Sequence, residues 1–83
     1  MKKEAELMLK VYVLIVTDPG ADRSVAQKLK EIGVVTQVNE VMGPYDIVAE
    51  LEVTNLNEIA PILDQRIRTI KGIVSTTSLP SIS

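Results

Sequence analysis

The 83-residue chain contains no cysteine, histidine, tryptophan or phenylalanine, and its only aromatic side chains are Tyr12 and Tyr45. Without cysteine the chain can form no disulfide and offers no thiol nucleophile. Without histidine it lacks the commonest general base and metal ligand. We therefore expect no metal site, no cofactor and no catalytic residues, and predict a protein that is not an enzyme.

The chain also lacks an excess of basic charge. Its net charge is −2, and acidic and basic residues alternate without a positive stripe that could neutralise phosphates. The apolar run Val11 to Val16 is too short to cross a membrane, and the segment from Met1 to Glu6 carries two acids where a secretory signal is basic. We expect a cytoplasmic protein that contacts neither nucleic acid nor membrane directly.

The length of the chain allows one domain, residues 1–83, with a core at about 9–79. A monomer of this size buries only about 60% of the surface that its unfolded chain exposes. Because neither disulfide nor metal can compensate, self-association is the expected source of additional stability.

Hydrophobic periodicity predicts six elements. β-Branched and alternating segments indicate strands at about 9–17, 34–42, 45–54 and 73–79, and apolar residues at helical spacing indicate helices at about 21–32 and 56–70. Asn55 is the expected N-cap of the second helix, and Pro61 should kink that helix or delay its regular start. Gly33 and Gly72 stand where left-handed helix caps are expected.

The predicted order of strand, helix, strand, strand, helix, strand is that of an α+β, ferredoxin-like βαββαβ fold. Right-handed crossovers would place both helices on one face of an antiparallel sheet with strand order 4-1-3-2. The central strand at 9–17 is apolar on both faces, and two helices can cover only one of them. We therefore predict a two-fold dimer that packs sheet against sheet.

The hairpin between the second and third strands has an unusual tip, Gly43-Pro44-Tyr45-Asp46. Gly43 allows a ligand to approach the backbone closely, and Asp46 offers a carboxylate to a cation such as an α-ammonium group. The alternative is a tight turn in which Asp46 bonds its own loop.

Four hydroxyl side chains follow one another in the last strand, Ser75 to Ser78. Thr76 and Ser78 point the same way and could hold a small carboxylate together with strand N–H groups. The alternative is an ordinary edge strand with polar side chains. Glu50 and Glu52 also share a strand face, but they lack the additional oxygen ligands of a cation site, so we interpret that face as solvated.

These segments resemble a known family. Leu14 to Thr17 followed by Pro19-Gly20, then Gly43-x-Tyr45-Asp46, then Gly72 to Ser78 are similar to the effector domain of the Lrp/AsnC family of prokaryotic transcription regulators. That domain is called RAM, for regulation of amino-acid metabolism, and the resemblance extends from about Val11 to Leu79.

The resemblance implies a ferredoxin-like domain that forms sheet-to-sheet homodimers, which assemble into octamers or decamers. It implies an amino acid or similar small effector bound between dimers, with Gly43, Tyr45, Asp46, Thr76 and Ser78 as the effector-binding residues. Ser78 stands where a second Thr is commoner. Such regulators carry a helix-turn-helix before this domain, whereas only a few residues precede the first strand in the given sequence. The chain therefore resembles a stand-alone effector domain or a piece of a longer protein, with full-length regulators as further candidate partners.

Three other functions fit the same pattern. A pure oligomerisation module would use the same sheet face without a ligand. An ACT-type regulatory domain shares the fold and ligand class but is normally fused to an enzyme. A small ferredoxin-like enzyme would need polar groups in a cleft over the sheet, for which only the two tyrosines are candidates.

Overall fold

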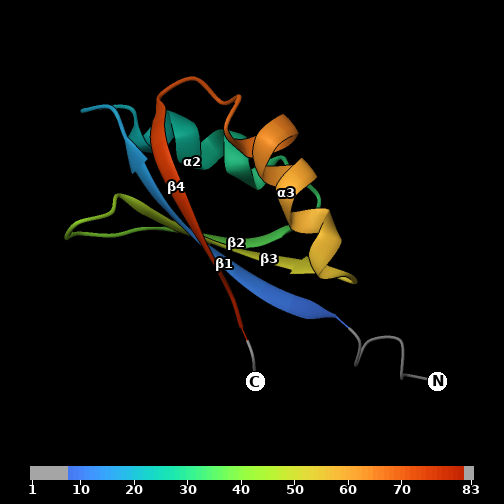
Figure 1. Ribbon diagram of the computed structural model, residues 1–83. Coiled ribbons are helices and arrows are strands. Elements are labelled where there is room, and N and C mark those ends of the chain that lie inside the picture. Colours follow the sequence, from blue (N-terminus) through green and yellow to red (C-terminus); the bar gives the residue numbers. More distant parts are fainter. Residues whose placement is uncertain (1–7, 82–83) are drawn as a thin grey trace.

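A computed structural model of the chain describes residues 8–81 (Figure 1). Four strands and two helical segments follow one another in the predicted order of strand, helix, strand, strand, helix, strand. Their bounds are β1 Leu9–Thr17, α2 Asp22–Lys30, β2 Val35–Glu40, β3 Ile47–Val53, η1 Leu56–Glu58, α3 Ile59–Ile62, η2 Leu63–Ile67 and β4 Ile73–Pro80.

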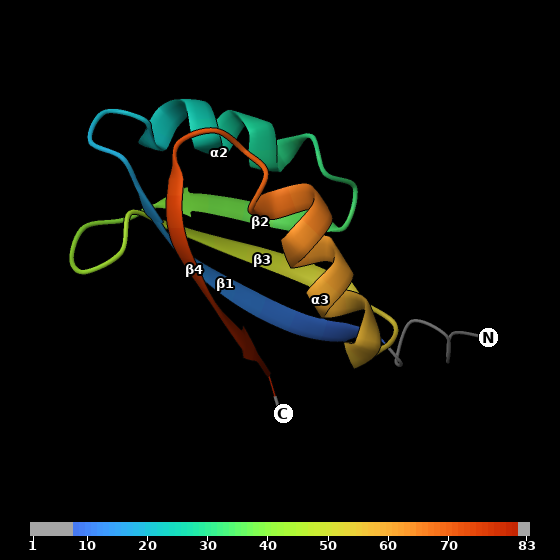
Figure 2. The same ribbon diagram turned by 45° about the horizontal axis from the view of Figure 1, so that its top comes forward.

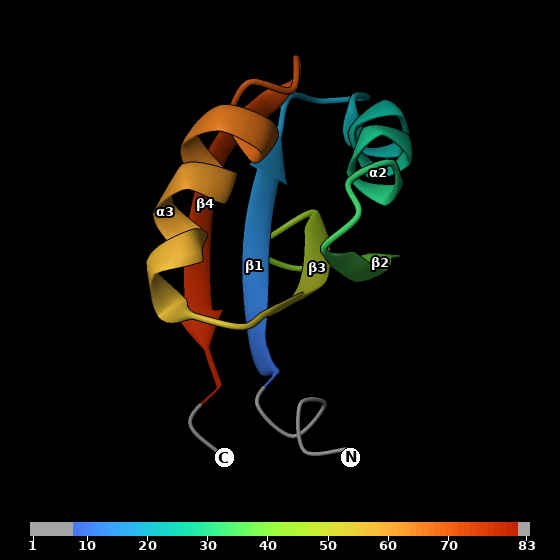
Figure 3. The same cartoon turned by 90° about the vertical axis from the view of Figure 1, so that its right-hand side faces the viewer.

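The strands form one antiparallel sheet in the order β2-β3-β1-β4, which is the predicted order read from the other edge. Both helical segments lie on the same face of this sheet (Figure 2). Seen along the sheet, α2 lies on the side of β2 and β3, whereas α3 runs beside β4 (Figure 3). The ferredoxin-like α+β fold is therefore confirmed, with β1 in a central position.

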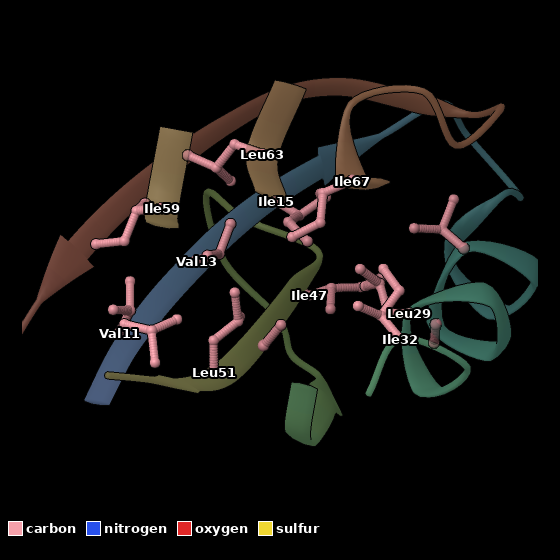
Figure 4. Packing of buried hydrophobic residues seen from close by; sticks show 14 residues of the cluster. Val11, Val13, Ile15, Leu29, Ile32, Ile47, Leu51, Ile59, Leu63 and Ile67 are labelled. Carbon is pink, nitrogen blue, oxygen red and sulfur yellow. The ribbon is translucent and has the colours of Figure 1, made fainter. Parts of the chain in front are cut away.

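The core lies between the sheet and the helices. Val11, Val13 and Ile15 of β1 point into it and are fully buried, as are Ile47 and Leu51 opposite them on β3. Figure 4 shows these side chains meeting Leu29 of α2 and Ile32 just after it, and Ile59, Leu63 and Ile67 of the second helical segment. Alternation along β1 thus directs every second residue to the helices.

The opposite face of the sheet is not covered by either helix. Tyr12, Leu14 and Val16 of β1 lie on it and are half-buried within the single chain. Leu14 pairs with Val48 of β3 and with Thr77 of β4, so these side chains share the face. This surface, which we call the outer face, is apolar along its centre.

The prediction for β2 was wrong in detail. A single alternation over residues 34–42 would put Val35 and Val38 on opposite faces. In the structure the register shifts between Val35 and Gln37, and both valines pack against the core. In a β-bulge, two residues of one strand lie opposite one residue of the partner strand. The extra residue shifts the alternation by one position, so that Val35 and Val38 both face the core.

The second helical segment is less regular than predicted and ends at Ile67 instead of residue 70. It begins with the 3₁₀ turn η1, and the α-helical part starts only at Ile59, so Pro61 lies in the first α-helical turn, where its missing N–H removes no hydrogen bond. The delayed start expected from Pro61 is confirmed. The predicted N-cap is also confirmed, because the Asn55 side chain accepts a hydrogen bond from the Asn57 N–H at 2.7 Å.

The two glycines expected to cap the helices differ. Gly33 does not have a positive φ, so its predicted left-handed cap is wrong; α2 ends at Lys30, with Glu31 in ordinary helical conformation. Gly72 has a φ of 103°, but it lies in the turn before β4. A Cβ atom there would come within 2.9 Å of the Ala21 Cβ. Only glycine therefore fits where the turn before β4 packs against the start of α2.

No helix within residues 8–81 is long and apolar enough to cross a membrane. The segment from Met1 to Glu6, on which the prediction about a secretory signal rests, lies outside the described residues.

Candidate functional site

The β2–β3 hairpin extends from the body of the molecule (Figures 1 and 2). It is closed by a hydrogen bond from the Val41 N–H to the Asp46 carbonyl at 2.9 Å. At its tip Gly43 has a φ of 123°, and no atom lies within 4 Å of a Cβ built on it. Met42 is 97% exposed, whereas Tyr45 is half-buried. The tip therefore presents an apolar side chain and open backbone to a partner or ligand.

The side chain of Asp46 does not bond its own loop. Its Oδ2 atom accepts hydrogen bonds from the Thr17 backbone N–H at 2.8 Å and from the Thr17 hydroxyl at 3.4 Å. Thr17 ends β1 and is only 7% exposed, so the carboxylate satisfies a donor that water reaches poorly. The alternative of a self-contained turn is therefore replaced by a contact that joins the hairpin to β1.

Thr76 and Ser78 lie on the helix-covered face of β4. Thr76 pairs with Ile15 and Ser78 with Val13, and directly paired residues of antiparallel strands share a face. Both side chains are half-buried. The two hydroxyls lie on one side of the strand, as alternation predicts, and the pairing identifies that side.

Arg68, which no sequence pattern singled out, contacts one hydroxyl of this pair, that of Thr76. Its Nε–H donates to the Thr76 hydroxyl at 2.9 Å, and its Nη1–H donates to the Asp64 carboxylate at 2.8 Å. Only the second contact has a sequence signal, the i,i+4 spacing of an acid and a base. The first depends on how η2 packs beside β4.

The hairpin and the hydroxyl pair do not meet within one chain. The Asp46 N–H donates to the Ile15 carbonyl from the β3 side, and Thr76 pairs with Ile15 from the β4 side. Their backbones are therefore separated by two strand spacings, about 10 Å. The ammonium and carboxylate groups of an α-amino acid are attached to the same carbon atom. One such ligand therefore cannot be expected to bind both groups of residues of a single chain.

The two glutamates of β3 have ordinary partners. Glu50 lies 3.7 Å from the Lys10 ammonium and accepts a hydrogen bond from the Thr36 hydroxyl at 3.1 Å. Glu52 pairs with Lys10 across the strands. Within residues 8–81 no group of three acidic side chains is close enough to hold a metal ion.

A shallow hollow lies at the edge of β2. It is lined by Lys30, Val35, Thr36, Gln37 and Val38. None of the predicted site residues contributes to it, so it does not correspond to the predicted effector site.

Known structures share the architecture. A crystal structure of a Thermus thermophilus protein superposes with a TM-score of 0.86 at 25% sequence identity, covering 90% of this chain and 94% of that one. A transcriptional regulator from Neisseria meningitidis, solved as a complex with L-Met, has a TM-score of 0.85 at 13% identity, covering all of this chain and 55% of that one. At this lower identity the likeness shows the fold alone.

Sequence comparison identifies the family. An uncharacterised helix-turn-helix-type transcriptional regulator of Pyrococcus furiosus is 30% identical over an alignment of 82 residues; the match covers 95% of this chain and 55% of the relative. The chain thus spans about half the length of the curated relatives that it matches. The family model for the Lrp/AsnC ligand binding domain matches residues 10–83. The chain belongs to the Lrp/AsnC ligand-binding domain family of transcriptional regulators.

Proposed function

We propose that the chain is a non-enzymatic module that binds an amino acid or similar small effector and thereby regulates transcription through its own assembly. The observation that carries this proposal is the carboxylate of Asp46. Thr17 holds its Oδ2 atom in place, whereas Oδ1 accepts no hydrogen bond from residues 8–81. A fixed carboxylate with one free oxygen, beside an exposed hairpin tip, suits an α-ammonium group.

The effector site, in this proposal, is shared between copies of the chain. Gly43, Tyr45 and Asp46 of one copy would face Thr76 and Ser78 of another, because the two sets are about 10 Å apart across β1 in a single chain. Asp46 would bind the ammonium, and the hydroxyls with nearby backbone would bind the carboxylate. The L-Met complex of the Neisseria regulator supports an amino acid as the ligand class.

Assembly would begin at the outer face. Tyr12, Leu14, Val16 and Val48 form an apolar stripe that a second copy can cover in a two-fold, sheet-to-sheet dimer. This leaves the hairpins free, and the exposed Met42 would contact the next dimer in an octamer or decamer. An effector acts on such an assembly only if it binds one state more tightly than another.

The module, in this proposal, affects DNA only indirectly. The described residues contain the ligand-binding fold, whereas the curated relatives are helix-turn-helix-type regulators. We therefore propose that the module acts in the cytoplasm on full-length regulators of its own family, or on a DNA-binding segment joined to it.

Light scattering combined with calorimetric titration of the twenty amino acids tests this proposal. The expected result is a mass several times that of one chain, together with binding of a subset of amino acids. A large assembly without any binding would favour a pure oligomerisation module. A monomer that binds none of them would contradict the proposal altogether.

A further inference from the structure

The side chain of Arg68 is held at two points, one on η2 and one on β4. Figure 3 shows the α3–η2 segment running beside β4. Arg68 follows this segment, and its guanidinium is bonded through Nε to Thr76 on the strand and through Nη1 to Asp64 on the helical segment. We propose that Arg68 is the centre of an anion-binding position whose ligand is the carboxylate of the effector, bound together with Thr76 and Ser78.

The hydrogen-bond geometry leaves donors available for an anion. A guanidinium has five N–H donors, and contacts among residues 8–81 use two of those of Arg68, leaving three. Thr76 accepts from Nε, so its own O–H proton is free to donate. The Ser78 hydroxyl, on the same face of β4, has no side-chain partner among the described residues. The three remaining guanidinium donors, together with the two hydroxyl groups, which can also donate, favour an oxyanion as the ligand.

The local charge supports the same ligand class. Residues 65–83 contain Arg66, Arg68 and Lys71 but no Asp or Glu side chain, in a chain whose net charge is −2. Asp64 is the one carboxylate bonded to Arg68, and it occupies Nη1 and leaves Nη2 open. Arg68 remains 51% exposed, so a ligand can reach it. Because two protein contacts already orient the guanidinium plane, little side-chain entropy is lost when an anion binds.

This inference rests on the proposed function for the identity of the ligand, but the anion position can be tested separately. In the first experiment the Arg68 Nε–H and Thr76 methyl NMR signals are followed during titration with sodium acetate, with sodium chloride at equal ionic strength as reference. Acetate-specific shifts at these two groups are expected in the wild type, and the shift of the Thr76 methyl signal should be absent in Arg68→Gln. The matched control is Arg66→Gln, which removes the same charge two residues away, where no contact to Thr76 exists.

The second experiment compares each amino acid that binds with its carboxamide, which lacks the negative charge. Calorimetry should show about tenfold or greater loss of affinity for the carboxamide, a similar loss for Arg68→Gln with the parent amino acid, and little change for Arg66→Gln. Circular dichroism of the variants checks that the fold is retained.

The outcomes separate the two proposals. Acetate shifts without amino-acid binding would support the anion position and contradict the proposed effector. Amino-acid binding that is equal for the carboxamide and unchanged in Arg68→Gln would overturn the role of Arg68 and leave the effector proposal standing. Phosphate shifting the same signals more strongly than acetate would overturn the carboxylate assignment. No shift and no binding would overturn both proposals.

Discussion

Asp46 and Thr17 are joined by a 2.8 Å hydrogen bond from the Thr17 backbone N–H to the Asp46 carboxylate, although 29 positions separate them in the sequence. The contact fixes the base of the β2–β3 hairpin to the end of the central strand. Thr17 is the one buried polar residue among those described, so water reaches its backbone N–H poorly. This N–H therefore depends on the Asp46 carboxylate as its acceptor.

Removal of the Asp46 carboxylate should therefore lower stability as well as binding. Asp46→Ala leaves the Thr17 N–H without an acceptor, and we expect the free energy of unfolding to fall by about 1–3 kcal/mol. Asp46→Asn keeps one carbonyl oxygen for this bond, so the loss should be smaller. Urea denaturation of both variants measures the difference, and equal stability of Asp46→Ala and wild type would contradict the structural role.

Gly72 and Gly43 provide a matched pair with positive φ. Gly43→Ala meets no neighbour, so only the backbone strain of about 1–2 kcal/mol is expected. Gly72→Ala adds close contacts to the Ala21 Cβ at 2.9 Å and to the Val25 Cγ2 at 3.1 Å, and overpacking costs about 1–3 kcal/mol more. Thermal unfolding should place Gly72→Ala below Gly43→Ala; the reverse order would refute the packing of Gly72 against α2.

Pro61 tests the irregular start of the second helical segment. Because it lies in the first α-helical turn, Pro61→Ala should change the free energy of unfolding by less than about 1 kcal/mol. A proline in a helix interior destabilises by about 3 kcal/mol, so a stability gain of that size would show that the regular helix begins earlier. Chemical denaturation distinguishes the two values.

Leu14 tests the outer face. Leu14→Glu puts a charge at the centre of the face, opposite Val48 and Thr77, and should reduce the mass measured by light scattering. Gln27→Glu adds the same charge on exposed α2 and should leave the mass unchanged. Circular dichroism of both variants confirms that they are folded. A Leu14→Glu protein with the wild-type mass would exclude this face as the dimer interface.

The fold follows from local patterns in the sequence. The bounds of β1 agree with the expectation at 9–17, and its two apolar faces correctly indicate a central strand. The predicted strand order places the second strand at an edge, and β2 lies there in the structure. These predictions succeed because alternation and helical spacing depend on neighbouring residues.

The parts that the sequence did not reveal depend on contacts between distant segments. The bulge near Thr36 lies in the pairing of β2 with β3, and the π-helical turn 63–67 carries Leu63 and Ile67, both buried in the core. Among the site residues, the bond from Asp46 to Thr17 spans 29 positions, and the contact of Arg68 with Thr76 joins two elements. Neither contact has a periodic signature that could have identified it.

The central claim is that the chain binds an amino acid through Asp46, and calorimetric titration of the wild type and of Asp46→Asn tests it most directly. The wild type should bind a subset of the twenty amino acids with a saturable heat. Asp46→Asn, which keeps the acceptor for Thr17 but not the negative charge, should bind the same ligands at least about tenfold more weakly. Equal affinity of the two proteins, or no binding by the wild type, would contradict the account.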